Sequence, residues 1–496
     1  MKVLFVQNNS LGIRVLQGVL TAFAYLLVIG LAGCDRLNLS RETREVVERI
    51  ESINEVMGSA VGMARVRPKQ YDNYVDLQNT ASREELYELT DHPNAVVRCY
   101  ASLALSESQS VDPLSILLNH IDDNESVITF FECIKTNVMV GDFLITNARY
   151  QLDSAQAATL DSTLIYKPNH LFSRATAIGR AVPCETLYWR LRELVLRDGD
   201  GAALEALAKY QREQDVELIL NNCDMQTFDE GTLDHAYRAI SYFPHPAFVP
   251  MLEKHLEHTL DNDHYYHEWQ YLYEAIASYQ NSKAVALLSV PFTRVEDKDI
   301  KLHHLEFVLN ALSIFTAPIY DSLLWRLWAD ENVISLNIFE YLSRKNPEKA
   351  LQLTRKNLYN AEAKFCRNRL TLNDLLGSAD DSLVANALLD FVLLKDRPFA
   401  LEVIRTNITD SSSYEFYACA DKASEIKDRS FVEPLFSRLI MDENPYIYLK
   451  AAEVLLFFND NEIDQRLVRT WRDIEDLKTG WGVDEFRKLL KEHGLN

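Results

Sequence analysis

Apolar residues recur at three- and four-residue steps from residue 40 onward, which is the spacing of one face of a helix. Ser40 is a residue type that caps helix N-termini, and Glu42 places an acid in the first turn. The first apolar stripe consists of Val46, Ile50, Ile53, Met57 and Ala60. We therefore expect an amphipathic helix of about 25 residues, ended by Pro68, and interpret it as the N-terminal cover of a helical array.

A second pattern recurs from about residue 83: a polar turn with Asp or Asn close to Pro, then an apolar helix with small residues. The clearest copies contain Asp91-His92-Pro93-Asn94 and Asp442-Glu443-Asn444-Pro445. Val127 follows Val96 by 31 residues, so residues 127–131 are expected to form the next helix. Weaker copies begin near residues 243, 280, 330 and 395. A lone helix pair exposes an apolar face that only neighbours can bury, so the pattern predicts a stacked array.

These units resemble HEAT repeats, particularly the short bacterial type also seen in phycobilisome-lyase-like proteins. The resemblance is good over residues 83–135 and 415–460, patchy over 240–410 and weak over 136–240. It implies an all-α fold, an α-solenoid of antiparallel helix pairs with roughly nine to twelve repeats. It also implies a ladder of a turn Asp and a helix Arg, which Asp91 and Arg98 match. Tyr448 stands in the Arg place of the last copy, so the ladder is broken there.

The first 34 residues differ from the rest of the chain. Lys2 and Arg14 give a positive start, residues 15–31 are almost wholly apolar, and Leu31-Ala32-Gly33-Cys34 follows. An apolar stretch of about 17 residues suits the central region of a signal peptide. The Leu-Ala-Gly-Cys run resembles the lipobox of bacterial lipoproteins, which implies cleavage before Cys34 and acylation of that cysteine. An uncleaved N-terminal anchor or ordinary secretion is the alternative.

The chain is therefore expected to have four parts: a cleaved signal peptide (1–33), a lipidated tether with the covering helix (34–82), a HEAT-like solenoid (83–470) and a C-terminal capping helix (471–496). In the last part Phe486, Leu489 and Leu490 form an apolar stripe, and Gly494 stands where a helix would stop. The run Asp198-Gly199-Asp200-Gly201 is interpreted as a turn between helices, because it lacks the later oxygen ligands of a calcium loop.

The net charge limits the classes of partner, and the spacing of the cysteines indicates the state of their thiols. The formal net charge is -22 at pH 7, which repels phosphate backbones, so nucleic acid is not expected as a partner. Anionic lipid is repelled as well, so attachment to a lipid bilayer needs the acyl chains on Cys34. None of the seven cysteines forms a C-x-x-C pair. Cys99 and Cys419 lie in apolar helical surroundings and are expected to be buried thiols.

Two neighbouring clusters are candidate sites. The first contains four histidines interleaved with acids, and imidazoles with carboxylates bind zinc and other divalent ions: His255, His258, His264 and His267. A hydrophilic turn between two helices is the alternative. The second contains three tyrosines in excess of what one buried stripe needs, Tyr265, Tyr266 and Tyr271. Exposed tyrosines suit protein recognition, and repeat packing is the alternative.

The sequence contains no glycine fingerprint, phosphate loop, nucleophile elbow or zinc-protease helix, so neither a catalytic residue nor a cofactor is predicted. The leading hypothesis is a non-enzymatic helical-repeat scaffold, lipid-anchored in the bacterial cell envelope outside the cytoplasm, that binds a protein or peptide partner. A metal-dependent enzyme or metal-binding factor using residues 255–267, and a purely structural envelope component, are the alternatives.

Overall fold

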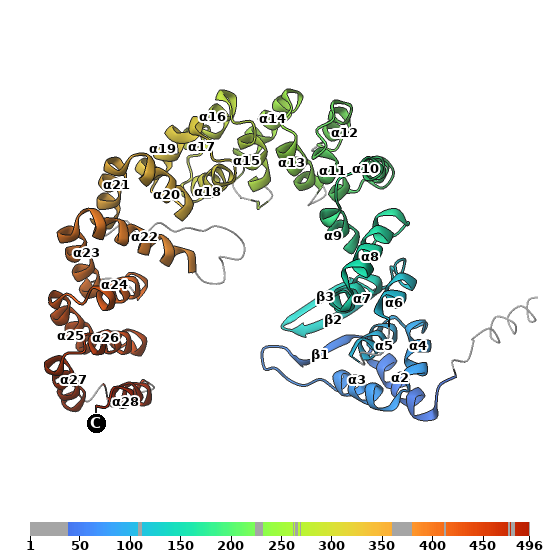
Figure 1. Cartoon of the computed structure of the whole chain (residues 1–496), viewed down its shortest axis with the longest axis horizontal. Coiled ribbons are helices and arrows are strands. Elements are labelled where there is room, and N and C mark those ends of the chain that lie inside the picture. The colour runs from blue at the N-terminus through green and yellow to red at the C-terminus, as the bar shows by residue number, and fades with distance from the viewer. Residues whose placement is uncertain are drawn as a thin grey trace, which may run out of the picture. The chain divides into compact units, whose positions relative to one another are not determined.

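The computed structural model describes residues 38–107, 112–223, 232–260, 262, 266–267, 269–359, 379–410, 413–474, 477 and 482–495. This part of the chain is mostly helical and contains one small three-stranded sheet (Figure 1). The expected all-α class is therefore correct for most of the described chain and incomplete at the sheet. The residues fall into two compact units that divide between Ala203 and Leu204. Within the described residues, no helix combines the length and the apolar character needed to cross a bilayer.

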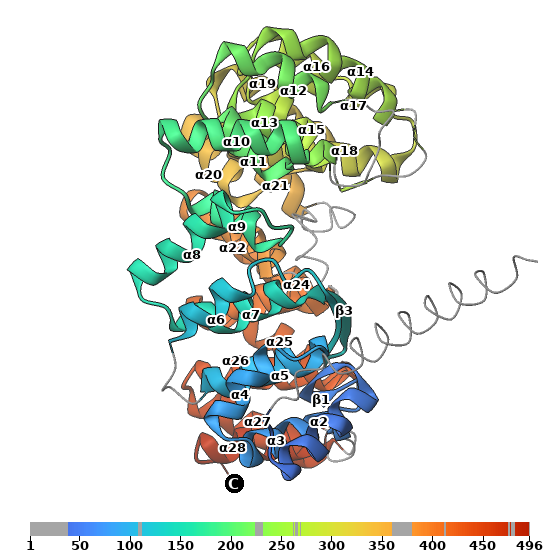
Figure 2. The ribbon, with the colours of Figure 1, turned by 90° about the vertical axis from the view of Figure 1, so that its right-hand side faces the viewer.

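The first unit is organised around a central helix, α5. Its residues Val97, Cys99 and Ala101 are fully buried, and the helix packs against α2, α3, α4 and α7 (Figure 2). The helices of this unit are α2 (Arg41–Ile53), α3 (Lys69–Thr80), α4 (Arg83–Thr90), α5 (Ala95–Glu107), α6 (Pro113–Asn119), α7 (Val140–Ala148), α8 (Ser154–Tyr166), α9 (Ser173–Arg180) and α10 (Glu185–Asp198).

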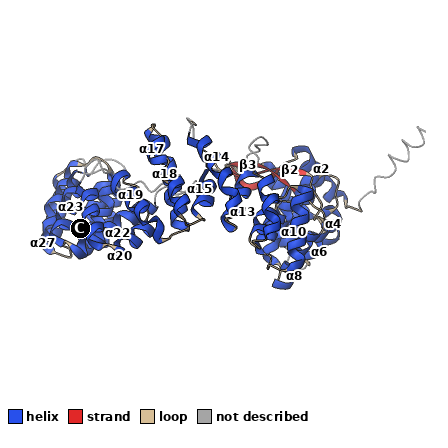
Figure 3. Ribbon diagram, turned by 90° about the horizontal axis from the view of Figure 1, so that it is seen from above, coloured by secondary structure: helices blue, strands red, loops and turns tan. Residues whose placement is uncertain are grey.

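A three-stranded sheet interrupts the helices of the first unit (Figure 3, red). Its strands are β1 (Val56–Val61), β2 (Ser126–Glu132) and β3 (Ile134–Met139), in the order β1-β2-β3. β1 runs parallel to β2, with Val56 opposite Thr129, and β3 runs antiparallel to β2, with Ser126 opposite Met139. α5 contacts both β1 and β2, so one side of the sheet belongs to the core of the unit.

The expectation of a helix at residues 127–131 is wrong, because these residues belong to strand β2. Ser126 and Ile128 are exposed, whereas Val127 and Thr129, which alternate with them, are buried. This two-residue alternation is that of a strand. β-branched and aromatic residues dominate the segment and favour extended backbone. A short apolar run cannot be assigned to helix or strand by its spacing alone, and here the pairing with β1 and β3 decides.

The expected 25-residue N-terminal helix is also wrong in its second half. α2 begins after Ser40, whose side chain accepts from the Thr43 N–H as predicted, and Val46 and Ile50 are buried. The helix ends at Asn54, which adopts a left-handed conformation with φ 57° and donates its N–H to the Ile50 carbonyl. The chain then continues as β1, so Met57 and Ala60 of the expected stripe are strand residues.

The second unit contains only helices among its described residues. They are α12 (Val216–Asn221), α13 (Thr232–Tyr242), α14 (Val249–Leu260), α15 (Trp269–Ala277), α16 (Ser282–Leu288), α17 (Pro291–Arg294), α18 (Lys298–Ile314), α19 (Asp321–Glu331), α20 (Leu336–Lys345), α21 (Pro347–Tyr359), α22 (Ala379–Lys395), α23 (Arg397–Asp410), α24 (Ser413–Ile426), α25 (Val432–Met441), α26 (Pro445–Phe457), α27 (Asn461–Asp473) and α28 (Val483–Glu492), with short 3-10 turns between some of them. α11 (Gly201–Ala208) runs across the boundary between the units.

Helices from α22 onward pack in two rows (Figure 1). α24 packs against α22 and α26, and α26 packs against α28, while α23 packs against α25 in the other row. The copy expected around residues 427–460 is found as α25 and α26, and Asn444 caps α26 by accepting from the Tyr446 N–H, with Pro445 in the first turn. Leu435, Ala451 and Leu455 are fully buried between these helices.

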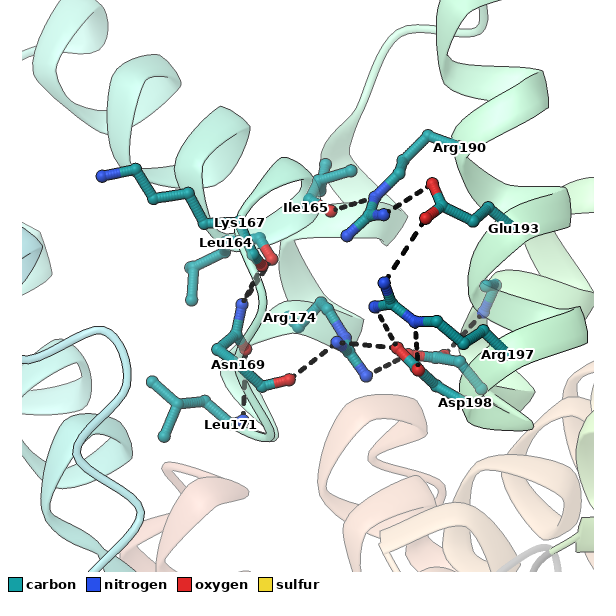
Figure 4. Close-up of polar contacts among 12 residues, drawn as sticks. Leu164, Ile165, Lys167, Asn169, Leu171, Arg174, Arg190, Glu193, Arg197 and Asp198 are labelled. Carbon is teal, nitrogen blue, oxygen red and sulfur yellow. Dashed lines mark hydrogen bonds and ion pairs between the residues drawn. The ribbon is translucent and has the colours of Figure 1, made fainter.

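Buried arginines join successive turns of the first unit. Arg98 bonds Asp123 of the following turn, with Nε–Oδ2 and Nη2–Oδ1 distances of 2.8 and 3.0 Å. Arg174 reaches Asp200 at 2.8 Å and donates to the Asn169 carbonyl, and Figure 4 shows it between the loop after α8 and the end of α10. The predicted turn at Asp198–Gly201 is thus found, with Gly199 at φ 63°, and its carboxylates hold an arginine.

Candidate binding groove

The four histidines singled out in the sequence are not gathered at one point of the described chain. His255 on α14 is buried, and its Nδ1 lies 2.7 Å from the hydroxyl oxygen of Tyr237 on α13. His258 and His267 are exposed, and His264 lies outside the described residues. No group of three His, Cys, Asp or Glu side chains that could hold a metal ion occurs among the residues that the structure describes. His255 is a core residue that bridges two helices.

The predicted tyrosine patch is only partly within the described chain. Tyr266 is about half exposed and meets Trp269 edge-on at a centroid distance of 5.6 Å. Tyr271 is half-buried, and the Arg238 guanidinium lies 4.1 Å from the centre of its ring and donates to its hydroxyl. Tyr265 lies outside the described residues. Tyr271 is therefore engaged within the unit, whereas Tyr266 stays accessible.

A buried pair that the sequence did not reveal lies next to these residues. His304 on α18 is fully buried, its Nδ1 is 2.7 Å from the Tyr273 hydroxyl oxygen, and its ring stacks on Trp269. Burial lowers the pKa of His304 to about 4, and the neighbouring His303 acts in the same direction. The imidazole is therefore neutral at pH 7 in the folded unit. His303 and His304 are adjacent in sequence, and only the packing determines which of them faces the core.

An open groove of about 450 Å³ crosses three successive helices of one row, α24, α26 and α28. Its lining combines aromatic rings, leucines and charges: Tyr417, Tyr446, Leu449, Lys450, Glu453, Glu485, Lys488, Leu489 and Glu492. Tyr446 is 63% exposed, so its ring is available to a ligand. The groove lies within the second unit and is formed by residues that are separated in sequence but brought together by the stacking of the row.

Local contacts hold the groove in shape. The Tyr417 hydroxyl donates to the Tyr446 carbonyl at 2.8 Å and joins α24 to the start of α26. At the other side, Gly482 precedes α28 and lies so close to Tyr448 and Pro445 that an added Cβ would overlap both side chains. Glycine at this position lets α28 approach α26, and Phe486 of α28 is then fully buried. Tyr448 stands at the position where the HEAT-like pattern has an arginine, and here the tyrosine packs between the helices.

A lysine paired with two carboxylates lines the groove, and the same pairing occurs one step earlier in the row. Lys450 on α26 lies 2.8 Å from Asp421 on α24 and 2.8 Å from Glu453 on its own helix. Lys422 on α24 makes the equivalent pairs with Asp390 on α22 and with Glu425. Burial by itself would lower the pKa of Lys450, but the bonds to the two carboxylates raise it. The repeated Lys-x-x-Glu at 422–425 and 450–453 is a signal that sequence reasoning missed.

The lining of the groove combines apolar side chains with charged ones. Tyr446, Leu449 and Leu489 give an apolar floor, and the glutamates of α28 place negative charge at the rim. The ammonium of Lys450 already has two carboxylate partners. Lys488 lies 3.8 Å from Glu492, so Glu485 is the charge of the described lining that remains for a ligand. The groove therefore favours a ligand with an apolar side chain and a basic group.

Neither models of known protein families nor curated proteins give a match to this chain. The resemblance to HEAT repeats and the lipoprotein signal therefore stay predictions. Cys34, on which the predicted anchor depends, lies outside the described residues.

Proposed function

We propose that this chain is an α-solenoid of HEAT-like antiparallel helix pairs, held in the bacterial cell envelope by lipid on Cys34, that binds a segment of a protein partner in the groove across α24, α26 and α28. The groove, whose apolar lining combines the exposed Tyr446 with Leu449 and Leu489, is the observation that carries this proposal. The two-row packing from α22 to α28 supports the repeat architecture, because each helix buries its apolar face on the next one.

The partner segment is expected to place an aliphatic or aromatic side chain against Leu449, Leu489 and the ring of Tyr446. A basic side chain of the partner would then face Glu485, which is exposed on α28. Aromatic anchors with a charged rim are the usual composition of a small protein-recognition site. The fixed helices of the row leave little backbone entropy to lose when the segment binds.

A photo-crosslinking amino acid in place of Tyr446 is expected to capture one predominant protein in native membranes. The matched control places the same amino acid at Met441, which is 81% exposed on α25 in the other row. A charge in the floor, Leu449→Asp, is expected to lower the Tyr446 adduct at least tenfold, because it puts an unpaired carboxylate into the apolar contact. Mass spectrometry of the adducts identifies the partner, and equal capture from both positions would contradict the groove.

Replacing Cys34 by serine is expected to move the protein from the membrane to the soluble or precursor fraction, because acylation of the thiol supplies the hydrophobic anchor. Metabolic labelling with a fatty-acid analogue and fractionation measure this result. Cys184→Ser, which removes another exposed cysteine, is the control and should leave the labelling unchanged. Undiminished lipid labelling of the Cys34→Ser chain would refute the anchor but would not affect the groove.

A further inference from the structure

Two turns of the first unit lie side by side at one end of the sheet. The first joins β1 to α3 and is closed by a bridge between Val61 and Val66. The second is the tight turn between β2 and β3, at Glu132 and Cys133. The Gly62 N–H donates to the Glu132 carbonyl and connects the two turns. We call residues 62–66 and 131–135 the sheet tip.

The sheet tip exposes four large apolar side chains. Met63 is 94% exposed, Ile134 66%, Val66 59% and Phe131 42%. They belong to two turns that are bonded to each other, and the register puts Phe131 and Ile134 on one face of the sheet and Val66 on the other, so the patch surrounds the tip on both faces. Soluble proteins seldom leave such a patch without a ligand or partner. Its place at the end of extended strands makes it a projection of the sheet (Figure 1).

The charge around this patch is opposite to that of the chain. Residues 56–71 and 126–139 contain four basic side chains, Arg65, Arg67, Lys69 and Lys135, and a single acid, Glu132, in a chain with a net charge of -22. Arg67 is paired with Asp72 and Lys135 with Glu55. Within the described residues, Arg65 and Lys69 have no acidic side chain in ion-pair range and stay available to an anion.

We propose that the sheet tip contacts an anionic lipid bilayer, with Met63, Val66 and Ile134 in the boundary between headgroups and acyl chains and with Arg65 at the phosphates. Apolar side chains bordered by bases match the interface of an anionic membrane, which offers hydrocarbon below a layer of negative charge. A protein partner would need no positive border here, whereas a phospholipid surface does. The net charge of the whole chain repels anionic lipid, whereas the bases near the sheet tip attract it.

The proposed anchor would hold the first unit near a bilayer, and this step rests on the proposed function; α4, to which the anchored segment bonds, and the turn between β2 and β3 lie at opposite sides of the unit (Figure 1). Cys34 precedes Asn38, the first described residue, by four residues, a span of at most about 14 Å. The N–H groups of Asn38 and Ser40 donate to Glu88 and Glu85 of α4, so the chain is attached to the first unit from that point. A lipidated Cys34 therefore holds this unit at the membrane surface.

The exposed Cys133 gives a direct readout, because it lies in the sheet tip. The full chain, with Cys184→Ser and Cys366→Ser, is labelled at Cys133 with a polarity-sensitive dye and mixed with vesicles of phosphatidylglycerol and phosphatidylcholine, or of phosphatidylcholine alone. We expect a blue-shifted emission with the anionic vesicles that is several-fold weaker with the neutral ones. Met63→Asp and Ile134→Asp should each abolish the shift, and both positions are exposed enough to accept the charge. The control chain carries the dye on Cys184, with Cys133→Ser, and should not respond.

Vesicle flotation separates this proposal from the anchor. Chains that float without a dye shift at Cys133 would overturn the sheet-tip contact and leave the anchor in place. If the chains do not float, the anchor fails, and a chain that also carries Cys34→Ser, so that the dye is not taken up there, is read at raised lipid concentration and low salt. The sheet tip alone should still give the shift there, and its absence overturns the proposal. A shift caused by membrane proteins but not by lipid vesicles would assign the patch to a protein partner instead.

Discussion

Replacement of Arg98 by methionine is expected to lower the free energy of unfolding of the first unit by about 3–5 kcal/mol. The side chain of Arg98 is 9% exposed and that of its partner Asp123 is 14% exposed. The guanidinium also bonds Glu125 at 2.7 Å and the carbonyls of His92 and Pro93 at 2.8 and 3.0 Å. Methionine fills a similar volume but leaves a carboxylate and two carbonyls without these donors.

Hydrogen exchange measured by mass spectrometry tests this result unit by unit, because the peptides of α5 and β2 report on the first unit alone. Arg67→Met is the matched control: it removes the Arg67–Asp72 pair, whose side chains are about half exposed, and should cost at most about 1 kcal/mol. Equal effects of the two substitutions would show that burial of the Arg98 pair does not matter. The peptides of the second unit should be unchanged in both variants.

Acidification from pH 7 to pH 5 is expected to lower the free energy of unfolding of the second unit by about 2 kcal/mol through His304. Its pKa is about 4 in the folded unit and 6.5 as the ordinary value, so the unfolded chain takes up the proton first as the pH falls. The contribution of the neutral imidazole is therefore complete above pH 6.5 and is lost progressively down to about pH 4. Below that pH the folded unit is protonated as well.

The variant His304→Gln keeps a polar group near Tyr273 and removes the titration. Urea unfolding of the full chain between pH 4.5 and 7.5, followed by exchange of peptides from α15 and α18, measures the slope of stability against pH. We expect a flatter slope for His304→Gln, even if its stability at pH 7 is reduced. His258→Gln, at an exposed position of α14, is the control and should keep the slope of the parent. An unchanged slope for His304→Gln would assign the pH dependence to other groups.

Helical spacing in the sequence predicts the elements whose packing is local. The turn at Asp442–Pro445 and the buried face with Ala451 and Leu455 follow from residues within one helix pair, and the structure has them. The stripe of Phe486 and Leu490 is buried as expected, and Gly494 has the positive φ of a helix end. Capping residues and apolar period act over a few residues, so they can be read without the rest of the fold.

Features that depend on distant residues were not predictable in the same way. β1 and β2 are stabilised by their pairing, in which Val56 lies opposite Thr129. The spacing of the apolar residues in either segment does not distinguish it from a short helix. The groove needs Tyr417 from α24, Tyr446 from α26 and Leu489 from α28, and these residues come together only when the row is assembled. The four histidines were conspicuous as a run of sequence, but His255 turns into the core toward Tyr237 while His258 faces solvent.

The parallel pairing of β1 with β2 also sets an order of assembly. β1 ends at Val61, and its partner strand is complete only at Glu132, after the four helices α3 to α6 have been synthesised. A nascent or translocating chain that emerges N-terminus first carries β1 with unsatisfied backbone groups during this interval, and such a strand is a template for intermolecular pairing. Closing so long a loop is also slow compared with forming a helix pair such as α25 and α26. The N-terminal unit should therefore depend on holdase chaperones more than the C-terminal one does.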